Sequence, residues 1–154
     1  MTVLKIKKMF EHVQLPEYAT PGAACFDIRF FAHPIPHIQE KFLVTEESSV
    51  IFTTGLQFEI PEGYVLEVYS RSGHGFKNNV RLANCVGIID SDYRGELLVK
   101  LANDTPGHWP LEVCHGDRIA QAKLTKVEQV KFMVVDELSE TARGANGGGS
   151  TGVK

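Results

Sequence analysis

The stretch VIFTTGLQFEIPEGYVLEVY, residues 50–69, carries the clearest structural signal in the chain. Its β-branched and aromatic runs are separated by Gly55, Pro61 and Gly63. Within the runs apolar and polar residues alternate, as in residues 57–60. A period of two is typical of strands that bury one face, so this stretch predicts short strands joined by turns.

Similar runs recur along the chain, whereas no long window repeats apolar residues at helical spacing. The further predicted strands cover residues 4–9, 87–89, 96–102, 118–124 and 130–135. Turn residues separate them roughly every ten residues, which predicts an all-β barrel or sandwich. Loops of all-β domains commonly carry the functional site. The segments expected to form such loops are residues 20–24, 70–79, 90–95 and 104–107.

Length, charge and cysteine content narrow the class of protein. The 154 residues suffice for one domain with a single core, and the formal net charge of −3 argues against nucleic-acid binding, which needs a basic surface. Residues 1–10 contain no long apolar stretch, so no signal peptide or membrane span is predicted. The chain has three cysteines, Cys25, Cys85 and Cys114, and no CxxC motif. An odd number of widely spaced cysteines indicates free thiols and a cytoplasmic location.

The C-terminal segment differs in composition from the rest of the chain. Residues 139–154 are rich in glycine and hold little apolar material to bury. We therefore expect a β domain over residues 1–138 and a mobile arm over residues 139–154. Such a segment is commonly a linker, but its glycines could also wrap a phosphate together with Arg143, Ser150 and Thr151.

The segment YSRSGHG, residues 69–75, follows a predicted strand and combines donors suited to phosphate. Arg71 offers a fixed fork of N–H groups, and Ser72 offers a hydroxyl. Gly73 allows a backbone N–H to approach an oxyanion. The alternative is an ordinary surface turn that contains an arginine.

The segment NCVGIIDSDYRGE, residues 84–96, runs from apolar residues into a turn with two carboxylates. Asp90 follows a buried run, where packing could fix its carboxylate so that it orients water as a general base. A hairpin is expected to bring residues 86–87 beside residues 93–94. The alternative is that Asp90 and its neighbour two residues on are simply turn formers.

The segment HGDRIAQ, residues 115–121, begins with a turn and enters an apolar strand. Gln121 lies in that strand and could donate a hydrogen bond to water or to a phosphate. Asp117 and Arg118 could equally form a structural ion pair.

Together these segments resemble the homotrimeric dUTPases over nearly the whole chain. Five motifs of that family have counterparts in order, at residues 19–28, 70–73, 84–96, 116–121 and 143–152. The run GIIDSDYRGE within the third motif is the most specific. Cys25 and Phe26 depart from the first motif, and Gly148 stands where the family usually has the phenylalanine that stacks over uracil.

The resemblance implies a jelly-roll-like β-barrel that assembles as a homotrimer, with each site shared between subunits. It implies hydrolysis of dUTP to dUMP and pyrophosphate by water attack on the α-phosphorus. That reaction keeps uracil out of DNA and supplies dUMP for thymidylate synthesis. The implied cofactor is Mg²⁺, held mainly by the triphosphate, with Asp27 near it through water.

The resemblance also distributes the remaining roles among three subunits. One chain would supply Asp90 as the general base, with Asn84 and Gly87 reading the uracil edge and Tyr93 packing under the sugar. A second chain would bind phosphates. Its implied residues are Arg71, Ser72, Gly73 and the catalytic partner Gln121. The arm of a third chain would close the site with Arg143, Ser150 and Thr151.

Two other functions share some of these features. The dCTP deaminases have the same fold and a related pocket, although the 90–96 turn fits the dUTPases better. A regulatory protein could instead bind dUTP as a signal and contact a protein partner, and the missing aromatic at Gly148 favours that alternative. A pure sensor would not need Asp90. Either a cell or a virus acting in its host's cytoplasm could use such a protein.

Overall fold

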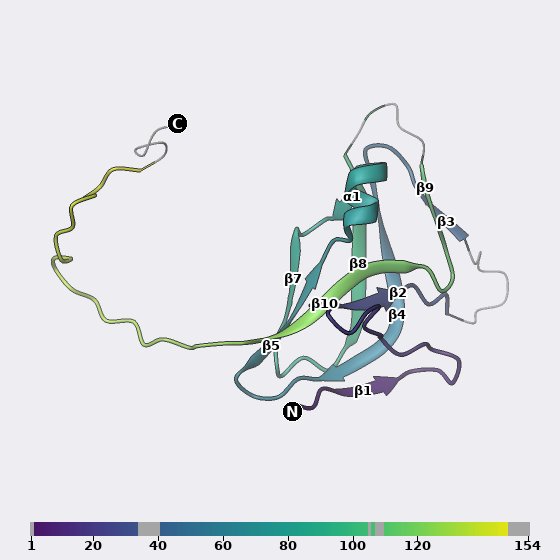
Figure 1. The fold of residues 1–154 in the computed structure, drawn as a ribbon, viewed down its shortest axis with the longest axis horizontal. Helices are drawn as coiled ribbons and strands as arrows, with labels where there is room; N and C mark the ends of the chain where they lie inside the picture. The colour runs from purple at the N-terminus through teal and green to yellow at the C-terminus, as the bar shows by residue number, and fades with distance from the viewer. Residues whose placement is uncertain (1, 34–40, 105, 107–109, 148–154) are drawn as a thin grey trace.

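The computed structural model describes residues 2–33, 41–104, 106 and 110–147 (Figure 1). Nearly all of its regular structure is β-strand, as the sequence predicts. The strands are β1 (Lys5–Lys8), β2 (Phe26–Arg29), β3 (Lys41–Val44), β4 (Ser48–Glu59), β5 (Tyr64–Tyr69), β6 (Val80–Leu82), β7 (Val86–Ile89), β8 (Glu96–Asn103), β9 (Leu111–Cys114) and β10 (Arg118–Lys126). The one helix among the described residues is α1 (Ser72–Asn78), which at seven residues is too short to cross a membrane.

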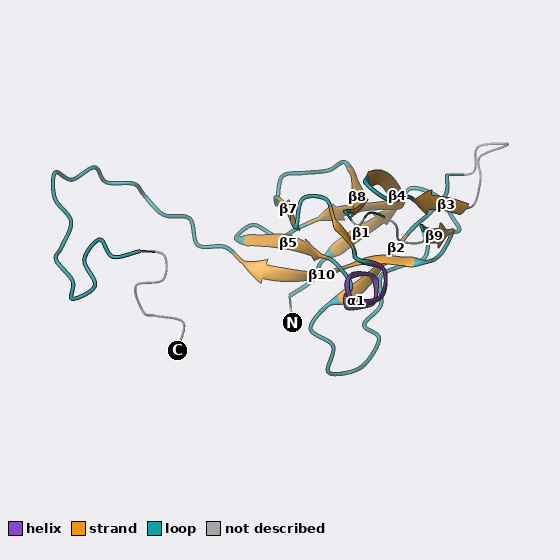
Figure 2. Cartoon of the chain, turned by 90° about the horizontal axis from the view of Figure 1, so that it is seen from above, coloured by secondary structure: helices purple, strands orange, loops and turns teal. Residues whose placement is uncertain are grey.

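The strands form two four-stranded antiparallel sheets, in the orders β1-β4-β8-β6 and β2-β10-β5-β7, and a small pair β3-β9. Viewed from above, the two sheets stack as layers (Figure 2). Neighbours within a sheet are distant in sequence, since β2 pairs with β10 and β4 pairs with β8. These long-range pairings make the jelly-roll-like β fold, and they confirm the predicted fold class.

The core lies between the two sheets and follows the alternation seen in the sequence. In β5, Leu66 and Val68 are buried while Glu67 and Tyr69 are only partly covered. The largest fully buried side chains come from both sheets: Phe52, Ile28, Leu56, Leu66, Leu82, Leu97, Leu101 and Ile119. Burial of such side chains is worth about 1.5–3 kcal/mol each, so this core fixes the strands that carry the site.

A glycine bend joins two predicted strands into the single long β4. Gly55 has a φ of 67°, and a Cβ at this position would lie 2.5 Å from Val13 Cγ2. The register with β8 shifts between Thr53 and Gln57. There the Glu96 carboxylate accepts hydrogen bonds from the backbone N–H groups of Thr54 and Gly55, at 3.1 and 2.7 Å. The bulge lets one strand bend around the core.

The structure corrects three expectations. The loop expected over residues 70–79 contains α1. The predicted hairpin across residues 90–95 is wrong, because β7 pairs with β5 whereas β8 pairs with β4 and β6 in the other sheet. The strand predicted over residues 130–135 is wrong as well. Residues 127–147 contain no strand and lead away from the sheets (Figure 1), and an apolar run forms a strand only where another strand pairs with it.

Candidate functional site

Arg71 is anchored at the point where β5 leads into α1. Its Nε donates to Asp27 Oδ1 at 3.0 Å, and its Nη1 donates to the carbonyl oxygen of Arg118 at 3.3 Å. The second Asp27 oxygen accepts a hydrogen bond from Arg118 Nη1 at 3.1 Å. Asp27 is only 14% exposed, so it bridges two arginines in a partly buried setting. A charge-assisted bridge of this kind fixes the guanidinium of Arg71 on β2 and β10.

Gln121 holds the residue before Arg71 from the same side. Its Nε2 donates to the carbonyl oxygen of Ser70 at 2.9 Å. The hydroxyl of Ser70 in turn accepts a hydrogen bond from the Leu82 backbone N–H, also at 2.9 Å. Three strands, β2, β10 and β6, therefore position the segment that carries the predicted phosphate donors.

Ser72 and Gly73 open α1 and are exposed. A Cβ at Gly73 would meet nothing within 4 Å, so this position offers open access to the backbone. The structure thus brings five of the predicted residues together. They are Asp27, Arg71, Ser72, Gly73 and Gln121.

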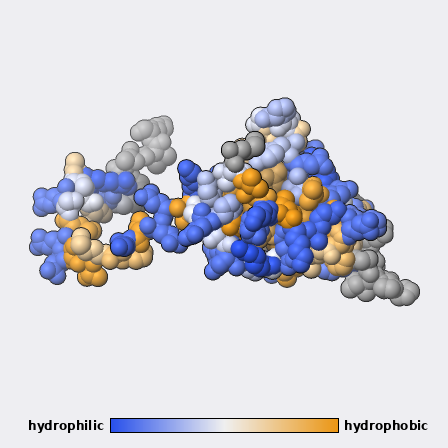
Figure 3. All heavy atoms as spheres, turned by 90° about the horizontal axis from the view of Figure 1, so that it is seen from below, coloured by the Kyte–Doolittle hydropathy of each residue, from blue (hydrophilic) through white to orange (hydrophobic). Residues whose placement is uncertain are grey.

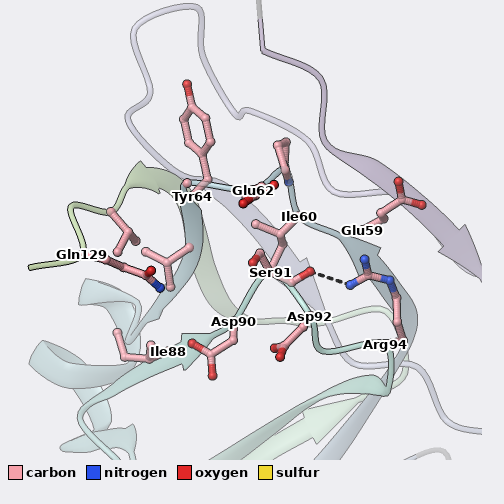
Figure 4. Close-up of a pocket in the computed structure, with 14 residues that line it drawn as sticks. Glu59, Ile60, Glu62, Tyr64, Ile88, Asp90, Ser91, Asp92, Arg94 and Gln129 are labelled. Atoms are coloured by element: carbon pink, nitrogen blue, oxygen red, sulfur yellow. Dashed lines mark hydrogen bonds between the residues drawn. The ribbon is translucent and has the colours of Figure 1, made fainter. Parts of the chain in front are cut away.

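Asp90 lies at the other end of β5, beside a cavity of about 940 Å³ (Figure 4). The cavity is lined by the turn after β4, the start of β5 and the turn after β7. The Asp90 side chain has no hydrogen bond or ion pair among the described residues, although its carbonyl accepts from the Tyr93 N–H at 3.2 Å. Its carboxylate is therefore free to bind a water molecule.

Carboxylates dominate the charge around this cavity. Arg94 is the one lining cation among the described residues, and it donates to the Ser91 carbonyl at 2.6 Å. The lining carboxylates are Glu59, Glu62, Asp90 and Asp92. Such a surface repels a triphosphate, so the cavity by itself is a poor site for the charged end of a nucleotide.

The residues predicted to read the base lie in β7 and in the turn before it. Gly87 is buried and pairs with Val68, and a Cβ at this position would lie 3.1 Å from Val68 Cβ and 3.7 Å from Asn84 Nδ2. Glycine therefore allows close packing of β7 against β5. The Asn84 side chain lies over this bare backbone and is exposed, which leaves its amide available to a ligand.

Tyr93 is held by the turn that follows. Its hydroxyl donates to the carbonyl oxygen of Glu96 at 3.0 Å. A Cβ at Gly95 would lie 2.3 Å from the Tyr93 oxygen, so only glycine allows this ring position. The residue remains 44% exposed, so its ring offers a flat surface.

A polar network on β5 and β10 adjoins the site. The hydroxyls of Tyr69 and Thr125 donate to Glu67 Oε2 at 2.6 and 2.8 Å, and Lys123 Nζ lies 3.4 Å from the same oxygen. The hydrogen bond from Tyr69 is the largest cause that lowers the pKa of Glu67, and the same bond raises the pKa of Tyr69. Since Tyr69 pairs with Gln121 across the strands, the network stabilises the strand pair that carries the site.

Asp90 and the phosphate donors do not meet within one chain. Ile89 pairs with Leu66, and Arg71 follows Leu66 by five residues of extended chain. That is roughly 17 Å at the rise of a strand. A single chain therefore separates Asp90 from the phosphate donors by more than the reach of a hydrogen bond.

The remaining predicted site residues lie in the C-terminal segment. Arg143 is exposed, and its Nε donates to the carbonyl oxygen of Asn146 at 3.0 Å. Among the described residues, its side chain makes no hydrogen bond or ion pair with the sheets, and Figure 1 shows residues 139–147 away from them. Ser150, Thr151 and the substituted Gly148 lie outside the described residues.

The sequence did not indicate that Arg118 and His74 belong to this cluster. The alternative that Arg118 forms an ion pair with Asp117 is wrong: Arg118 bonds Asp27 instead, whereas Asp117 Oδ2 accepts from the Cys114 backbone N–H at 2.8 Å. His74 Nε2 lies 2.9 Å from the carbonyl oxygen of Arg118. Both contacts join residues more than forty positions apart, and no local pattern signals them.

Among the described residues, no group of three or more histidine, cysteine, aspartate or glutamate side chains is placed to hold a metal ion. Asp27 is the one carboxylate among the five predicted residues that the structure brings together around Arg71. Its two oxygens each accept one hydrogen bond from an arginine, and a carboxylate oxygen has a further lone pair for a water molecule. These residues fit a hydrated ion carried by a ligand rather than one bound directly by the protein.

Comparison with known proteins points to one family. The dUTPase family profile matches residues 11–152. A deoxyuridine 5'-triphosphate nucleotidohydrolase of Helicobacter hepaticus is 41% identical over 150 residues, which cover 97% of this chain and 89% of that protein.

Two solved structures share the fold. The match to the dUTPase of Staphylococcus bacteriophage 80alpha with dUPNHPP has a TM-score of 0.82 at 24% identity and covers 99% of this chain and 100% of that chain. A dUTPase variant of phage phi11 of S. aureus is described with a structural Mg(II) ion. Its match has a TM-score of 0.73 at 21% identity and covers 88% of this chain and 98% of that chain. With the family profile spanning almost all of its length, the chain belongs to the dUTPase family.

Proposed function

We propose that the two separated groups of site residues, contributed by different copies of this chain, hydrolyse dUTP. As a member of its family the protein is a dUTP diphosphatase, which converts dUTP and water to dUMP and pyrophosphate. The residues around Arg71 and the residue Asp90 differ in charge and in their contacts, and this difference supports the division of roles. The Arg71 cluster offers fixed phosphate donors, whereas Asp90 is an unpaired carboxylate beside a cavity.

Asp90 acts as the general base in this proposal. It accepts a proton from a water molecule whose oxygen forms a bond to the α-phosphorus. The bond from the α-phosphorus to the bridging oxygen breaks, and the electron pair leaves with pyrophosphate. Arg71 and Ser72 donate hydrogen bonds to the oxygens on which charge develops, and the N–H of Gly73 adds a third donor.

Gln121 supports this step by holding the backbone of Ser70, and its remaining amide oxygen is free to accept from the same water. Mg²⁺ supplies charge neutralisation when it is bound to the triphosphate. Asp27 would contact that ion through water while it keeps Arg71 in place. The carboxylates around the Asp90 cavity support a role for Mg²⁺. They would repel the four negative charges of dUTP unless a bound cation neutralised part of that charge.

Asn84 and the backbone at Gly87 would read the edge of uracil, and Tyr93 would pack against the deoxyribose. Cytosine has a donor where uracil has an acceptor, so polar groups matched to uracil would be left unpaired. A ribose 2'-hydroxyl would clash with the Tyr93 ring. These contacts would confine the reaction to dUTP among the common nucleotides.

A homotrimer with shared sites is part of the proposal. It is supported by the separation of Asp90 from the phosphate donors and by exposed apolar side chains after β10, seen as orange spheres in the segment that leads away from the domain (Figure 3). Val130, Phe132 and Val134 are 65%, 95% and 97% exposed, and apolar residues in such a run are usually buried against a partner. The arm beyond residue 139 would then close a site on another copy through Arg143, Ser150 and Thr151. The free thiols of the cysteines support a cytoplasmic location.

The test is pyrophosphate release from dUTP with Mg²⁺, measured beside dCTP, dTTP and UTP. We expect rapid release from dUTP alone. Uracil nucleotides formed from dCTP would identify a deaminase, and tight dUTP binding without pyrophosphate would identify a regulatory sensor. Sedimentation equilibrium of the full chain at micromolar concentration would test the trimer, and a monomer with full activity would contradict the shared site.

A further inference from the structure

Helix α1 presents Ser72 and Gly73, yet little within the helix holds it in place. It has seven residues, includes two glycines and buries none of its residues. Arg71 at its N-cap makes no side-chain capping hydrogen bond. Isolated helices of this length and composition are unstable in water, so the position of α1 depends on its tethers to the rest of the protein.

His74 provides such a tether. Within the described part of the chain, it is the one α1 side chain with a hydrogen bond to another element, between its Nε2 and the carbonyl oxygen of Arg118 at 2.9 Å. A carbonyl oxygen only accepts, so the ring nitrogen Nε2 carries the proton and donates. The same oxygen accepts the 3.3 Å hydrogen bond from Arg71 Nη1.

The topology explains why this carbonyl is available. β5 ends at Tyr69, which pairs with Gln121 on β10. The residues of β10 before Gln121 therefore have no β5 partner, and Arg71 and His74, which follow the end of β5 in sequence, reach one of them. Arg71 and His74 bond the Arg118 carbonyl that the strand ladder leaves open on this side. His74 thereby links the first turn of α1 to the Asp27–Arg71–Arg118 cluster.

We infer that His74 is a positioning residue for triphosphate binding, acting through Arg71 and Ser72. Its hydrogen bond keeps the first turn of α1 against β10, so that the Arg71 guanidinium, the Ser72 hydroxyl and the Gly73 N–H converge on one ligand. This role rests on the proposed dUTPase function. It assigns to His74 no contact with the substrate and no proton transfer.

The test compares His74→Leu, which removes the donor, with His74→Gln, whose amide N–H can reach the same carbonyl. In His74→Leu we expect kcat/KM for dUTP to fall about tenfold, the effect of losing one well-placed hydrogen bond. His74→Gln should stay within about threefold of wild type. Circular dichroism of all three proteins at the assay temperature confirms that each is folded.

Ligand binding separates positioning from a general structural role. We expect His74→Leu to weaken binding of an α,β-imido analogue of dUTP by about tenfold and to leave dUMP binding unchanged, because dUMP lacks the β- and γ-phosphates. Arg71→Ala/His74→Leu should lose less analogue affinity than the sum of the two single losses, since part of the effect of His74 passes through Arg71.

Three results would overturn the inference: wild-type behaviour of His74→Leu, equal impairment of His74→Gln, or equal weakening of dUMP and analogue binding. Failure of the wild-type protein to hydrolyse dUTP would instead overturn the proposed function. The binding measurements with the analogue would still decide the role of His74 in that case.

Discussion

The two ends of β5 carry opposite kinds of polar group. Where β5 leads into α1, Asp27, Arg71 and Gln121 each make short hydrogen bonds to other elements of the fold. At the other end, the Asp90 carboxylate has no hydrogen bond to any part of the chain that the structure describes. Hydrogen bonds hold the polar side chains at one end in place, whereas the carboxylate at the other end has none.

The difference follows from what each group must do. Donors that stabilise developing negative charge work best when they are already in place, because no reorganisation is then needed during the reaction. A general base must accept a proton, and a carboxylate whose lone pairs are occupied by cations is a weaker base. Stability and reactivity are thus assigned to different ends of the same strand.

The largest effect is expected for Asp90→Asn. Loss of the general base should lower kcat by about 10²–10⁴-fold, whereas binding of the imido analogue and the free energy of unfolding should remain close to wild type. Steady-state pyrophosphate release and analogue titration measure the two quantities.

Asp92→Asn is the matched control, since Asp92 lines the same cavity two residues away. It should keep most of the activity. Wild-type turnover in Asp90→Asn would remove the proposed base, and equal loss in both variants would point to the charge of the cavity instead.

Deletion of residues 143–154 should produce the next largest effect. Removing Arg143, Ser150 and Thr151 takes several donors from the triphosphate, and we expect kcat/KM to fall by at least about a hundredfold. The β fold should keep its thermal midpoint, because the described residues of this segment, 143–147, contribute no side chain to the core. Normal rates in the truncated protein would show that the arm plays no part in the reaction.

Asp27→Ala should affect both stability and activity, in contrast to Asp90→Asn. It leaves Arg71 and Arg118 without their shared carboxylate, and we expect the free energy of unfolding to fall by about 1–2 kcal/mol. Denaturant unfolding measures this change, and the KM for dUTP should rise as Arg71 loses its orientation. If Asp27→Ala were as stable as wild type, the bridge would contribute little to the fixed end of β5.

The smallest effect concerns the polar network beside the fixed cluster. The pKa of Glu67 is lowered in the folded protein, so its contribution to stability is present above its unfolded value near 4.5 and is lost as the pH falls through the lower folded value. Glu67→Gln should therefore flatten the acid side of the stability profile.

Thermal midpoints of wild type and Glu67→Gln, measured from about pH 3 to pH 7, test this expectation. The two profiles should differ most at the neutral end. Parallel profiles would mean that other carboxylates cause the acid destabilisation.

Local patterns predicted the strands that have a clear period of two, such as β5 and β8. Strands of three or four residues show little of a period: β1 and β7 were predicted, whereas β2, β3, β6 and β9 were missed. The strand predicted at residues 130–135 is wrong for a different reason. β-branched residues favour a strand, but hydrogen bonding to a neighbouring strand decides whether one forms.

The candidate site divides in the same way. Residue chemistry within short segments singled out Arg71, Ser72 and Asp90. It did not link Arg118 to Asp27, or His74 to Arg118, because these contacts join residues separated by 91 and 44 positions. The order of strands in the sheets places them together.

The sequence by itself determined the all-β class and the chemical nature of the site, because alternation and side-chain donors are properties of neighbouring residues. Only the tertiary structure decided that the phosphate donors are tied to β2 and β10 while Asp90 stands free at the far end of β5. The physical reason is that strand pairing is a long-range interaction: β2 meets β10, and β5 meets β7, through hydrogen bonds that no local segment contains.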